Sequence, residues 1–272
     1  MLSRVCARLS RHAWLRKRVW HAVYEFLAAR RVSVEWEFMN YGYVPGPGDG
    51  PPAVLRRDDE SNRLQIAMYH QMFDGARCRG QKVLDIGCGR GGGLKYIQTY
   101  LDPLACTGVD FSSRAVRICR RRLAGETSTV AVAEADALPF ATCRFDWVVN
   151  VESSHCYPSM ERFVAEASRV LKPGGLFVIA DFRDADEVDA FQRQLSTPTL
   201  RVVRLHDITA NVVWALEHDS SRKEALIHRY IPGPFRGAVT EFAGVTGSRI
   251  HEAFRCGTTR YLSVTLKKTE AP

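Results

Sequence analysis

A glycine-rich segment is the first candidate binding site in the sequence. Residues 83–93 read Val-Leu-Asp-Ile-Gly-Cys-Gly-Arg-Gly-Gly-Gly, the pattern of a short buried strand, a tight turn and a helix start. Backbone N–H groups at such a helix start favour an anionic group of a ligand. Gly87, Gly89 and Gly91 give the spacing G-x-G-x-G, whereas Gly87, Gly89 and Gly92 give the dinucleotide fingerprint G-x-G-x-x-G. The glycines alone do not show whether the turn binds a dinucleotide or another ligand with an anionic group.

Carboxylates near the glycines distinguish these ligands in part. Asp85 stands two residues before Gly87, where it would repel a pyrophosphate but could pair with the ammonium group of a methionine moiety. Asp110 ends the next expected strand and would accept hydrogen bonds from ribose hydroxyls of either ligand. After the third expected strand, Asp136 and an adjacent backbone N–H can bind the edge of an adenine ring, with apolar neighbours packing on its face.

Strands and helices alternate along the middle of the chain and must position these residues. The alternation predicts an α/β fold with a doubly wound, Rossmann-like sheet of seven mostly parallel strands. In such sheets the carboxyl ends of parallel strands form the ligand-binding edge. Strands are expected at residues 82–86, 105–109, 129–134, 145–151, 175–181, 201–205 and 259–267. Helices are expected at residues 60–76, 91–100, 113–124, 160–171, 185–195 and 207–230, with another short helix before residue 255.

Composition divides the chain into four parts. Residues 1–59 hold a basic amphipathic helix and then four prolines and three glycines within residues 43–52, which predicts an N-terminal helical lid with a hinge. Residues 60–206 form the expected ligand-binding core. Residues 207–255 are an expected helical cap over the edge of the sheet, and residues 256–272 supply the final strand and a tail.

Five segments in this order and spacing resemble the class I S-adenosylmethionine-dependent methyltransferases. They are the glycine-rich segment, the strand end at Asp110, and residues 134–140, 145–158 and 170–181. The resemblance covers about residues 60–208 and implies S-adenosylmethionine as cofactor, with S-adenosylhomocysteine as product. The residues that it places on the cofactor are Asp85, Gly87, Gly89, Gly91, Asp110, Phe111, Ser112, Asp136, Ala137, Leu138 and Asn150.

Four segments resemble, more closely, the phthiotriol/phenolphthiotriol dimycocerosate methyltransferases, which O-methylate a hydroxyl on a large lipid, and their relatives that act on polyketides and fatty acids. These segments are residues 38–43, 150–158, 197–200 and 228–232. The resemblance implies a small-molecule hydrophobic acceptor, with Glu152 and Tyr157 in its pocket. The match is shorter in the cap, the part that selects the substrate, so the sequence supports the type of reaction better than it identifies the acceptor.

His155 and Asp181 are the candidate catalytic residues. Methyl transfer from a sulfonium needs mainly in-line alignment of the reacting atoms, but an aliphatic hydroxyl must also lose its proton, which requires a general base. His155 follows the fourth expected strand, and imidazole titrates near neutral pH. Asp181 ends the fifth expected strand, where it could orient the imidazole and stabilise its cation. Similar positions carry the base pair in related sugar O-methyltransferases.

Two aromatic residues and a cysteine complete the expected site. Tyr41 and Tyr43 precede the hinge and suit a lid that closes over the sulfonium by cation–π attraction, although packing against the body of the protein is an equal alternative. Cys156 is expected in the wall of the pocket, because sulfonium chemistry needs no covalent intermediate.

Other functions remain open from the sequence. A fatty-acid or polyketide carboxyl methyltransferase would use the same cofactor site without a base. A sterol-type C-methyltransferase has a related glutamate motif, here at Glu152. A non-methylating descendant would hold the cofactor only as a structural part. A dinucleotide-binding enzyme is the least favoured of these alternatives.

Composition and charge limit the classes of protein. A chain of 272 residues with 46% hydrophobic residues and no uncharged apolar run of about 18 residues is expected to be globular and not membrane-spanning. Residues 1–31 carry eight basic side chains against Glu25 alone. The helix expected there suits packing on the body of the protein or peripheral contact with an anionic membrane surface. No matching basic face recurs, so nucleic-acid binding is not predicted.

Cysteine and histidine spacing predicts neither disulfides nor metal. The eight cysteines contain no C-x-x-C pair, and the histidines lack a spacing such as H-E-x-x-H that would place ligands on one helix face. Reduced thiols and the lack of a visible secretory signal predict a reducing, cytoplasmic location. The sequence leaves the oligomeric state open.

Overall fold

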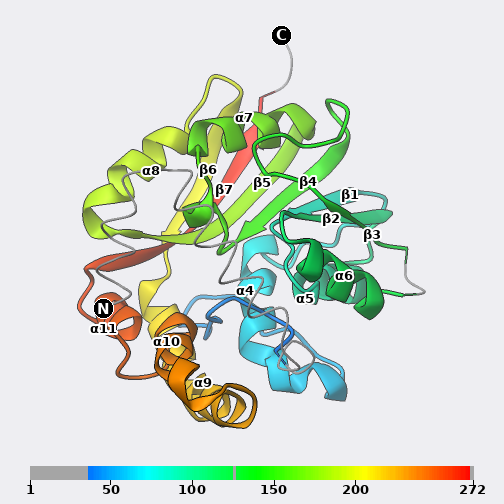
Figure 1. Ribbon diagram of the computed structural model, residues 1–272. Helices are drawn as coiled ribbons and strands as arrows, with labels where there is room; N and C mark the ends of the chain where they lie inside the picture. Colours follow the sequence, from blue (N-terminus) through cyan, green and yellow to red (C-terminus); the bar gives the residue numbers. More distant parts are fainter. Residues whose placement is uncertain (1–35, 125–126, 270–272) are drawn as a thin grey trace.

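Seven strands form one sheet in the order β3-β2-β1-β4-β5-β7-β6 (Figure 1). The structure, a computed structural model, describes residues 36–124 and 127–269. Adjacent strands run parallel except at β7, which is antiparallel to both β5 and β6. The expected α/β fold with a mostly parallel seven-stranded sheet is confirmed. The strands are β1 (Lys82–Ile86), β2 (Ala105–Asp110), β3 (Thr129–Val132), β4 (Phe145–Val151), β5 (Leu171–Asp184), β6 (Leu200–Asp207) and β7 (Thr259–Lys268).

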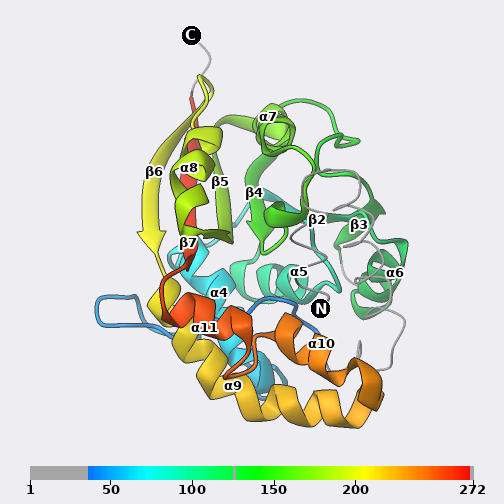
Figure 2. The same cartoon turned by 60° about the vertical axis from the view of Figure 1, so that its left-hand side comes forward.

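Helices cover both faces of this sheet. One apolar cluster packs α4, α5 and α6 against one face, and a second packs α7 and α8 against the other (Figures 1 and 2). A third cluster joins α9 and α10 with Trp36. The helices are η1 (Arg57–Asn62), α4 (Arg63–Phe73), α5 (Gly92–Tyr96), η2 (Ile97–Leu101), α6 (Ser113–Arg122), η3 (Ser154–Cys156), α7 (Met160–Val170), η4 (Ala185–Glu187), α8 (Val188–Leu195), α9 (Thr209–Tyr230), α10 (Gly233–Ala243) and α11 (Arg249–Arg255).

Burial and capping explain where the central elements begin and end. The strand β4 lies inside the sheet between β1 and β5, and six of its seven residues are buried, as expected for a central parallel strand. The hydroxyl of Ser112 caps α6 by accepting a hydrogen bond from the Ala115 N–H at 3.1 Å. Ser159 caps α7 in the same way through the Arg162 N–H at 3.2 Å. These caps fix the segments that follow β2 and β4.

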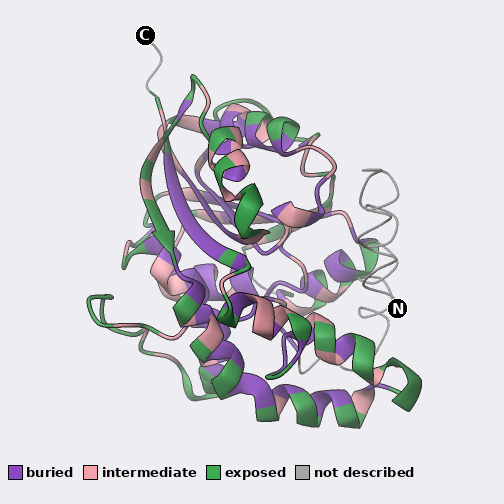
Figure 3. Ribbon diagram, turned by 90° about the vertical axis from the view of Figure 1, so that its left-hand side faces the viewer, coloured by how far each residue is buried: buried purple, intermediate pink, exposed green. Residues whose placement is uncertain are grey.

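An extended segment, residues 36–44, links the core to the helices α9–α11. We call it the aromatic strap, because Trp36, Phe38, Tyr41 and Tyr43 in it are all buried. The guanidinium of Arg90 donates a hydrogen bond to the Trp36 carbonyl at 2.7 Å. Figure 3 shows buried residues along the central strands and exposed ones on the outer side of α9. The strap is therefore part of the packed interior although it has no regular structure.

Several expected bounds differ from the structure. The helix expected at residues 91–100 is α5 followed by the π-helical turn η2, and the helix expected at residues 60–76 is η1 followed by α4. The expected strand at residues 175–181 is too short at both ends, because β5 begins at Leu171, where α7 has just ended, and continues to Asp184, so Asp181 lies within the strand rather than at its end. Residues 232–234, Pro-Gly-Pro, lie at the start of α10, so two helices follow α9 where one short helix was expected.

The basic helix expected within residues 1–31 lies outside the described residues. Within residues 36–124 and 127–269, no helix is both long enough and apolar enough to cross a membrane.

Candidate active site

The glycine-rich segment forms a tight turn at the carboxyl end of β1. Gly87, Gly89 and Gly91 have φ values of 78°, 53° and 88°, which side chains other than hydrogen disfavour. A Cβ on Gly87 would lie 2.4 Å from the Oγ of Ser153, and one on Gly91 would lie 2.5 Å from the Sγ of Cys119. The glycines therefore let the turn pack against α6 on one side and against the segment after β4 on the other.

A cavity of about 990 Å³, its open mouth included, lies beside this turn at the carboxyl edge of the sheet. The strands β1, β2, β3 and β4 all end at its wall. The lining residues include Met39, Gly87, Gly89, Arg90, Asp110, Phe111, Ser112, Asp136, Glu152, Ser153, Cys156 and Tyr157. Most of the residues that the sequence predicted for the cofactor and acceptor thus meet in one cavity.

Asp110 joins the end of β2 to the glycine turn. One carboxylate oxygen accepts a hydrogen bond from the Gly89 N–H at 2.9 Å, and the other accepts one from the Ser112 N–H at 2.8 Å. A carboxylate has about four acceptor positions, so Asp110 can still bind ligand hydroxyls from the cavity wall.

Asp85 lies in the core next to the turn and is not on the cavity wall. Neither of its carboxylate oxygens has a hydrogen-bond partner within the described part of the chain. Burial, assisted by the charge of Asp110, raises the pKa of Asp85 to about 8. A buried carboxyl group without a hydrogen-bond partner is rare in folded proteins and calls for an explanation other than packing.

The segment after β3 supplies a carboxylate to the cavity. Asp136 lines the wall. Ala137 and Leu138 are not on it, and their N–H groups donate hydrogen bonds to the Glu134 carbonyl at 3.2 Å and to the Glu166 carboxylate at 2.6 Å. The structure therefore brings Asp136 to the expected adenine position but leaves these two N–H groups engaged within the protein.

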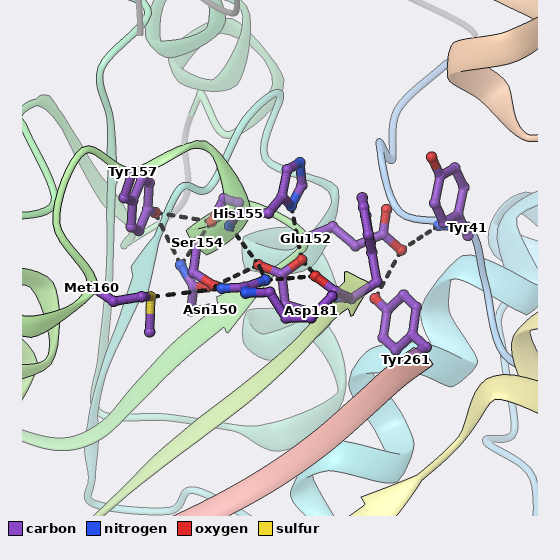
Figure 4. A network of polar contacts seen from close by, with 12 residues as sticks. Tyr41, Asn150, Glu152, Ser154, His155, Tyr157, Met160, Asp181 and Tyr261 are labelled. Atoms are coloured by element: carbon purple, nitrogen blue, oxygen red, sulfur yellow. Dashed lines mark hydrogen bonds and ion pairs between the residues drawn. The ribbon is translucent and has the colours of Figure 1, made fainter. Parts of the chain in front are cut away.

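His155 and Asp181 are in direct contact. The His155 Nδ1 lies 2.8 Å from Asp181 Oδ1, and the backbone N–H of His155 donates to Asp181 Oδ2 at 2.9 Å (Figure 4). The imidazole packs on the Phe182 ring with centroids 4.4 Å apart. The adjacent residues Cys156 and Tyr157 line the cavity. The segment after β4 and the C-terminal part of β5 thus assemble a histidine–carboxylate pair beside it.

Burial and the neighbouring charges determine the protonation states of His155 and Asp181. Burial lowers the pKa of His155, but Cys156 and the Asp181 carboxylate outweigh burial and raise it to about 10. Burial would raise the pKa of Asp181, but His155 and then Arg183 hold it well below its usual range. Asp181 is therefore ionised, and His155 holds its proton firmly.

Ser154 and Arg183 also contact Asp181, and neither was predicted from the sequence. The Ser154 hydroxyl donates to Asp181 Oδ2 at 2.5 Å, and Arg183 lies 3.4 Å from the same oxygen. Arg183 also donates to the Ser154 oxygen at 2.8 Å and stacks over the Phe191 ring at 4.2 Å. Arg183 stands two residues after Asp181, so a basic residue at that spacing in a strand was the available clue.

Asn150 and Tyr157 lie close together between the glycine turn and the segment after β4. The Asn150 amide donates to the Ile86 carbonyl at 2.8 Å and to the Tyr157 hydroxyl at 3.0 Å. Asn150 is fully buried and does not line the cavity, whereas Tyr157 does. Asn150 therefore contacts the turn and Tyr157 from behind the cavity wall.

The two tyrosines of the aromatic strap lie apart. The Tyr41 N–H donates to the Glu152 carboxylate at 2.7 Å, and its ring packs between Phe182 and Phe254, with centroids 5.8 Å away in each case. The Tyr43 hydroxyl donates to Asp49 at 2.7 Å and lines a second cavity under the proline-rich segment. The structure therefore brings Tyr41 next to Glu152, but neither tyrosine lines the first cavity.

Comparisons with known proteins agree with this geometry. A family model described as a methyltransferase domain matches residues 84–179. The phthiotriol/phenolphthiotriol dimycocerosates methyltransferase of Mycobacterium tuberculosis (strain ATCC 25618 / H37Rv) is 35% identical over 245 residues, which are 90% of each chain. The fatty-acid O-methyltransferase of Mycolicibacterium smegmatis is 34% identical over 239 residues, 88% of this chain and 86% of that one.

Solved structures share the fold. The [4+2]-cyclase SpnF superposes with a TM-score of 0.67 at 16% identity, covering 92% of this chain and 95% of its own. The geranyl diphosphate C-methyltransferase from Streptomyces coelicolor A3(2), solved with S-adenosyl-L-homocysteine, gives a TM-score of 0.62 at 19% identity, covering 90% and 98%. The fold, the glycine turn and the similarity along nine-tenths of the sequence agree, and the chain belongs to the S-adenosylmethionine-dependent methyltransferases, in the family of the phthiotriol/phenolphthiotriol dimycocerosates methyltransferases.

Proposed function

We propose that this enzyme transfers a methyl group from S-adenosylmethionine to a hydroxyl of a hydrophobic acceptor, such as a lipid or polyketide, with His155 as general base. The observation that carries the proposal is the contact of His155 Nδ1 with Asp181 at 2.8 Å beside the cavity. Methylation of a carboxylate requires no base, because the nucleophile is already ionised. A built histidine–carboxylate pair therefore favours a hydroxyl acceptor.

The cavity suits S-adenosylmethionine. Asp110 and Asp136 on the cavity wall fit the ribose and the adenine, and the partnerless carboxyl of Asp85, which does not line the cavity, lies behind the glycine turn where it can attract the ammonium group. The glycine turn allows close approach of the ligand to the backbone, since the described residues place no atom within 4 Å of a Cβ built on Gly89. When bound, the cofactor supplies an electrophilic methyl group on a cationic sulfur.

His155 and Asp181 have different roles in the proposed reaction. Asp181 holds the proton-bearing Nδ1 of His155, which leaves Nε2 as the nitrogen that accepts the proton of the hydroxyl. Ionised Asp181 then stabilises the imidazolium. Cys156 and Tyr157 form part of the cavity wall, where they exclude water from the acceptor oxygen.

A carboxyl acceptor is the second candidate function. The observation that favours it is the 34% identity to a protein named fatty-acid O-methyltransferase. Both candidates share the cofactor site and differ in their need for the base, so one variant separates them.

The first test is calorimetric binding of S-adenosylhomocysteine to the wild-type protein and to Asp110→Ala, with NAD as control. Micromolar binding that the substitution weakens is the expected result, and binding of NAD instead would refute the cofactor assignment.

The second test is activity of His155→Ala on 1-decanol and on decanoic acid. We expect a loss of roughly 10²–10⁴-fold on the alcohol. Full activity of the variant, or an ester as the sole product of the wild type, would refute the hydroxyl acceptor.

A further inference from the structure

Glu152 is a buried acid that the proposed proton transfer does not use. It directly follows β4 and lines the cavity, with 8% of its surface exposed. Its backbone has a φ of 46°, which is unusual for a residue with a side chain. Its N–H donates to the Ala180 carbonyl at 2.9 Å. A strained and buried acid at a cavity wall indicates a functional constraint rather than a packing need.

One oxygen of Glu152 is held by two donors. Oε1 accepts hydrogen bonds from the Tyr41 N–H at 2.7 Å and from the Tyr261 hydroxyl at 2.8 Å (Figure 4). These donors come from the aromatic strap and from β7, so the carboxyl group is fixed from two sides. Oε2 has no hydrogen-bond partner among the described residues. The fixed group therefore keeps one oxygen available to a molecule in the cavity.

The nearby cations act on Glu152 only from a distance, and their ion pairs are with other carboxylates. The Asp181 carboxylate is balanced by His155 and Arg183. Lys223 of α9 is buried and lies 3.9 Å from Asp219, with its ammonium over the Tyr41 ring at 5.7 Å. No ion pair joins Lys223, or any other described cation, to Glu152.

We propose that Glu152 determines acceptor specificity, because its Oε2 accepts a hydrogen bond from a hydroxyl acceptor and its negative charge rejects a carboxylate acceptor. The proposal rests on the proposed hydroxyl methylation and deepens it by naming what the site excludes. A hydroxyl can donate a hydrogen bond to Oε2, whereas an ionised carboxylate has no proton to donate and would place two like charges together in a buried site.

Proton linkage makes this rejection measurable. Burial raises the pKa of Glu152 to about 7, although the hydrogen bonds from Tyr41 and Tyr261 oppose the rise. Above about pH 7, Glu152 is ionised in the free protein. It must therefore take up a proton before decanoate can bind beside it. The dissociation constant of decanoate should then rise about tenfold for each further pH unit, because each bound anion requires one proton. The binding of 1-decanol carries no such requirement.

The experiment measures calorimetric binding of decanoate and of 1-decanol at pH 6 to 9, with S-adenosylhomocysteine present. For the wild type we expect the decanoate dissociation constant to rise steeply above pH 7, and for Glu152→Gln we expect most of that rise to vanish. Burial lowers the pKa of Lys223 to about 8. Loss of the Lys223 charge above that pH accounts for any small rise that remains in the decanoate dissociation constant of the variant. His155, with its pKa raised to about 10, stays protonated over this range.

The Tyr261→Phe variant is the matched control, because it removes one donor to Glu152 and keeps the charge. Its decanoate curve should keep the steep rise but begin it at a higher pH, since the lost hydrogen bond favoured the ionised acid. Equal decanoate curves for wild type and Glu152→Gln would overturn the proposal, and so would a wild type that binds decanol no better than decanoate at pH 9. Failure of the proposed function is separate, because it shows in the product, an ester instead of an ether.

Discussion

At the scale of single residues, Asp85 destabilises the folded protein at neutral pH, whereas its proposed role is to bind the cofactor. Its carboxyl is fully buried without a hydrogen-bond partner among the described residues, and its pKa is raised to about 8. The ordinary aspartate pKa is 3.8, so the unfolded chain ionises first and the folded state loses stability as the pH rises from about 4 to 8. Above pH 8 the loss is constant.

Asp85→Asn should therefore stabilise the free protein and weaken cofactor binding. We expect a gain of about 1–3 kcal/mol in the free energy of unfolding at pH 8 and little gain at pH 4, because the amide removes a buried charge. Urea denaturation at the two pH values measures the gain, and S-adenosylhomocysteine calorimetry measures the loss of affinity. A variant that is less stable than wild type at pH 8 would contradict this account.

The pH profile of the reaction follows from His155. Only the neutral imidazole can accept a proton, and its pKa is raised to about 10, so kcat/KM on a hydroxyl acceptor should increase with pH through the neutral range. Arg183→Gln removes a cation beside Asp181, which strengthens the attraction of Asp181 for the imidazolium and should move the profile to higher pH. Arg183→Lys should restore it in part. Initial rates at pH 6 to 10 test this, and an unshifted profile for Arg183→Gln would refute it.

At the scale of elements, the glycine turn must leave room for the segment after β4. Gly87 and Gly174 have similar φ values of 78° and 75°, but a Cβ on Gly87 would lie 2.4 Å from Ser153 Oγ, whereas a Cβ on Gly174 would have no described atom within 4 Å. Ser153 directly precedes η3, which carries His155.

Alanine at these two glycines should separate backbone strain from crowding. Gly174→Ala should cost about 1 kcal/mol of unfolding free energy, from its positive φ alone. Gly87→Ala should cost about 1–3 kcal/mol more, because Ser153 must move, and it should also lower kcat. Urea denaturation and initial rates compare the two, and equal costs would show that the close approach to Ser153 has no consequence.

The strands were predictable because each is a short apolar run between turn residues. The bounds expected for β1 and β4 agree with the structure. The start of β5 was not predictable, since its pairing of Leu171 with Phe145 crosses an irregularity in the ladder that no local pattern encodes. The cap was predicted with one helix too few, because Pro232 to Pro234 suits both a turn and a helix start.

The grouping of polar residues was predictable where they lie at or near the carboxyl ends of strands, as do Asp110, His155 and Asp181. The contacts of Glu152 were not, since Tyr41 and Tyr261 lie 111 and 109 residues away in the sequence. Tyr43 resembled Tyr41 in the sequence, yet its hydroxyl bonds to Asp49, only six residues away, and that local partner holds it at the other cavity.

At the scale of the whole molecule, ligand binding should stabilise the fold, because the first cavity is formed by the ends of four strands. S-adenosylhomocysteine at one hundred times its dissociation constant should add about 2.7 kcal/mol to the unfolding free energy. This corresponds to a rise of roughly 5–10 °C in Tm for a chain of this size. Differential scanning fluorimetry measures the rise. The same concentration of NAD should leave Tm unchanged, and an equal rise with NAD would contradict the assignment.

The antiparallel strand β7 also has a consequence during protein synthesis. The strand β6 pairs with the sheet only through β7, and residues 208–258 separate the two in the sequence. At roughly 5–20 residues per second, a ribosome needs roughly 3–10 s to add this segment. During that time β6 has no partner strand, and even in the folded protein Val203 and Leu205 on it stay 46% and 37% exposed. The nascent chain should therefore be most prone to capture by chaperones, or to aggregation, in the interval between the synthesis of β6 and that of β7.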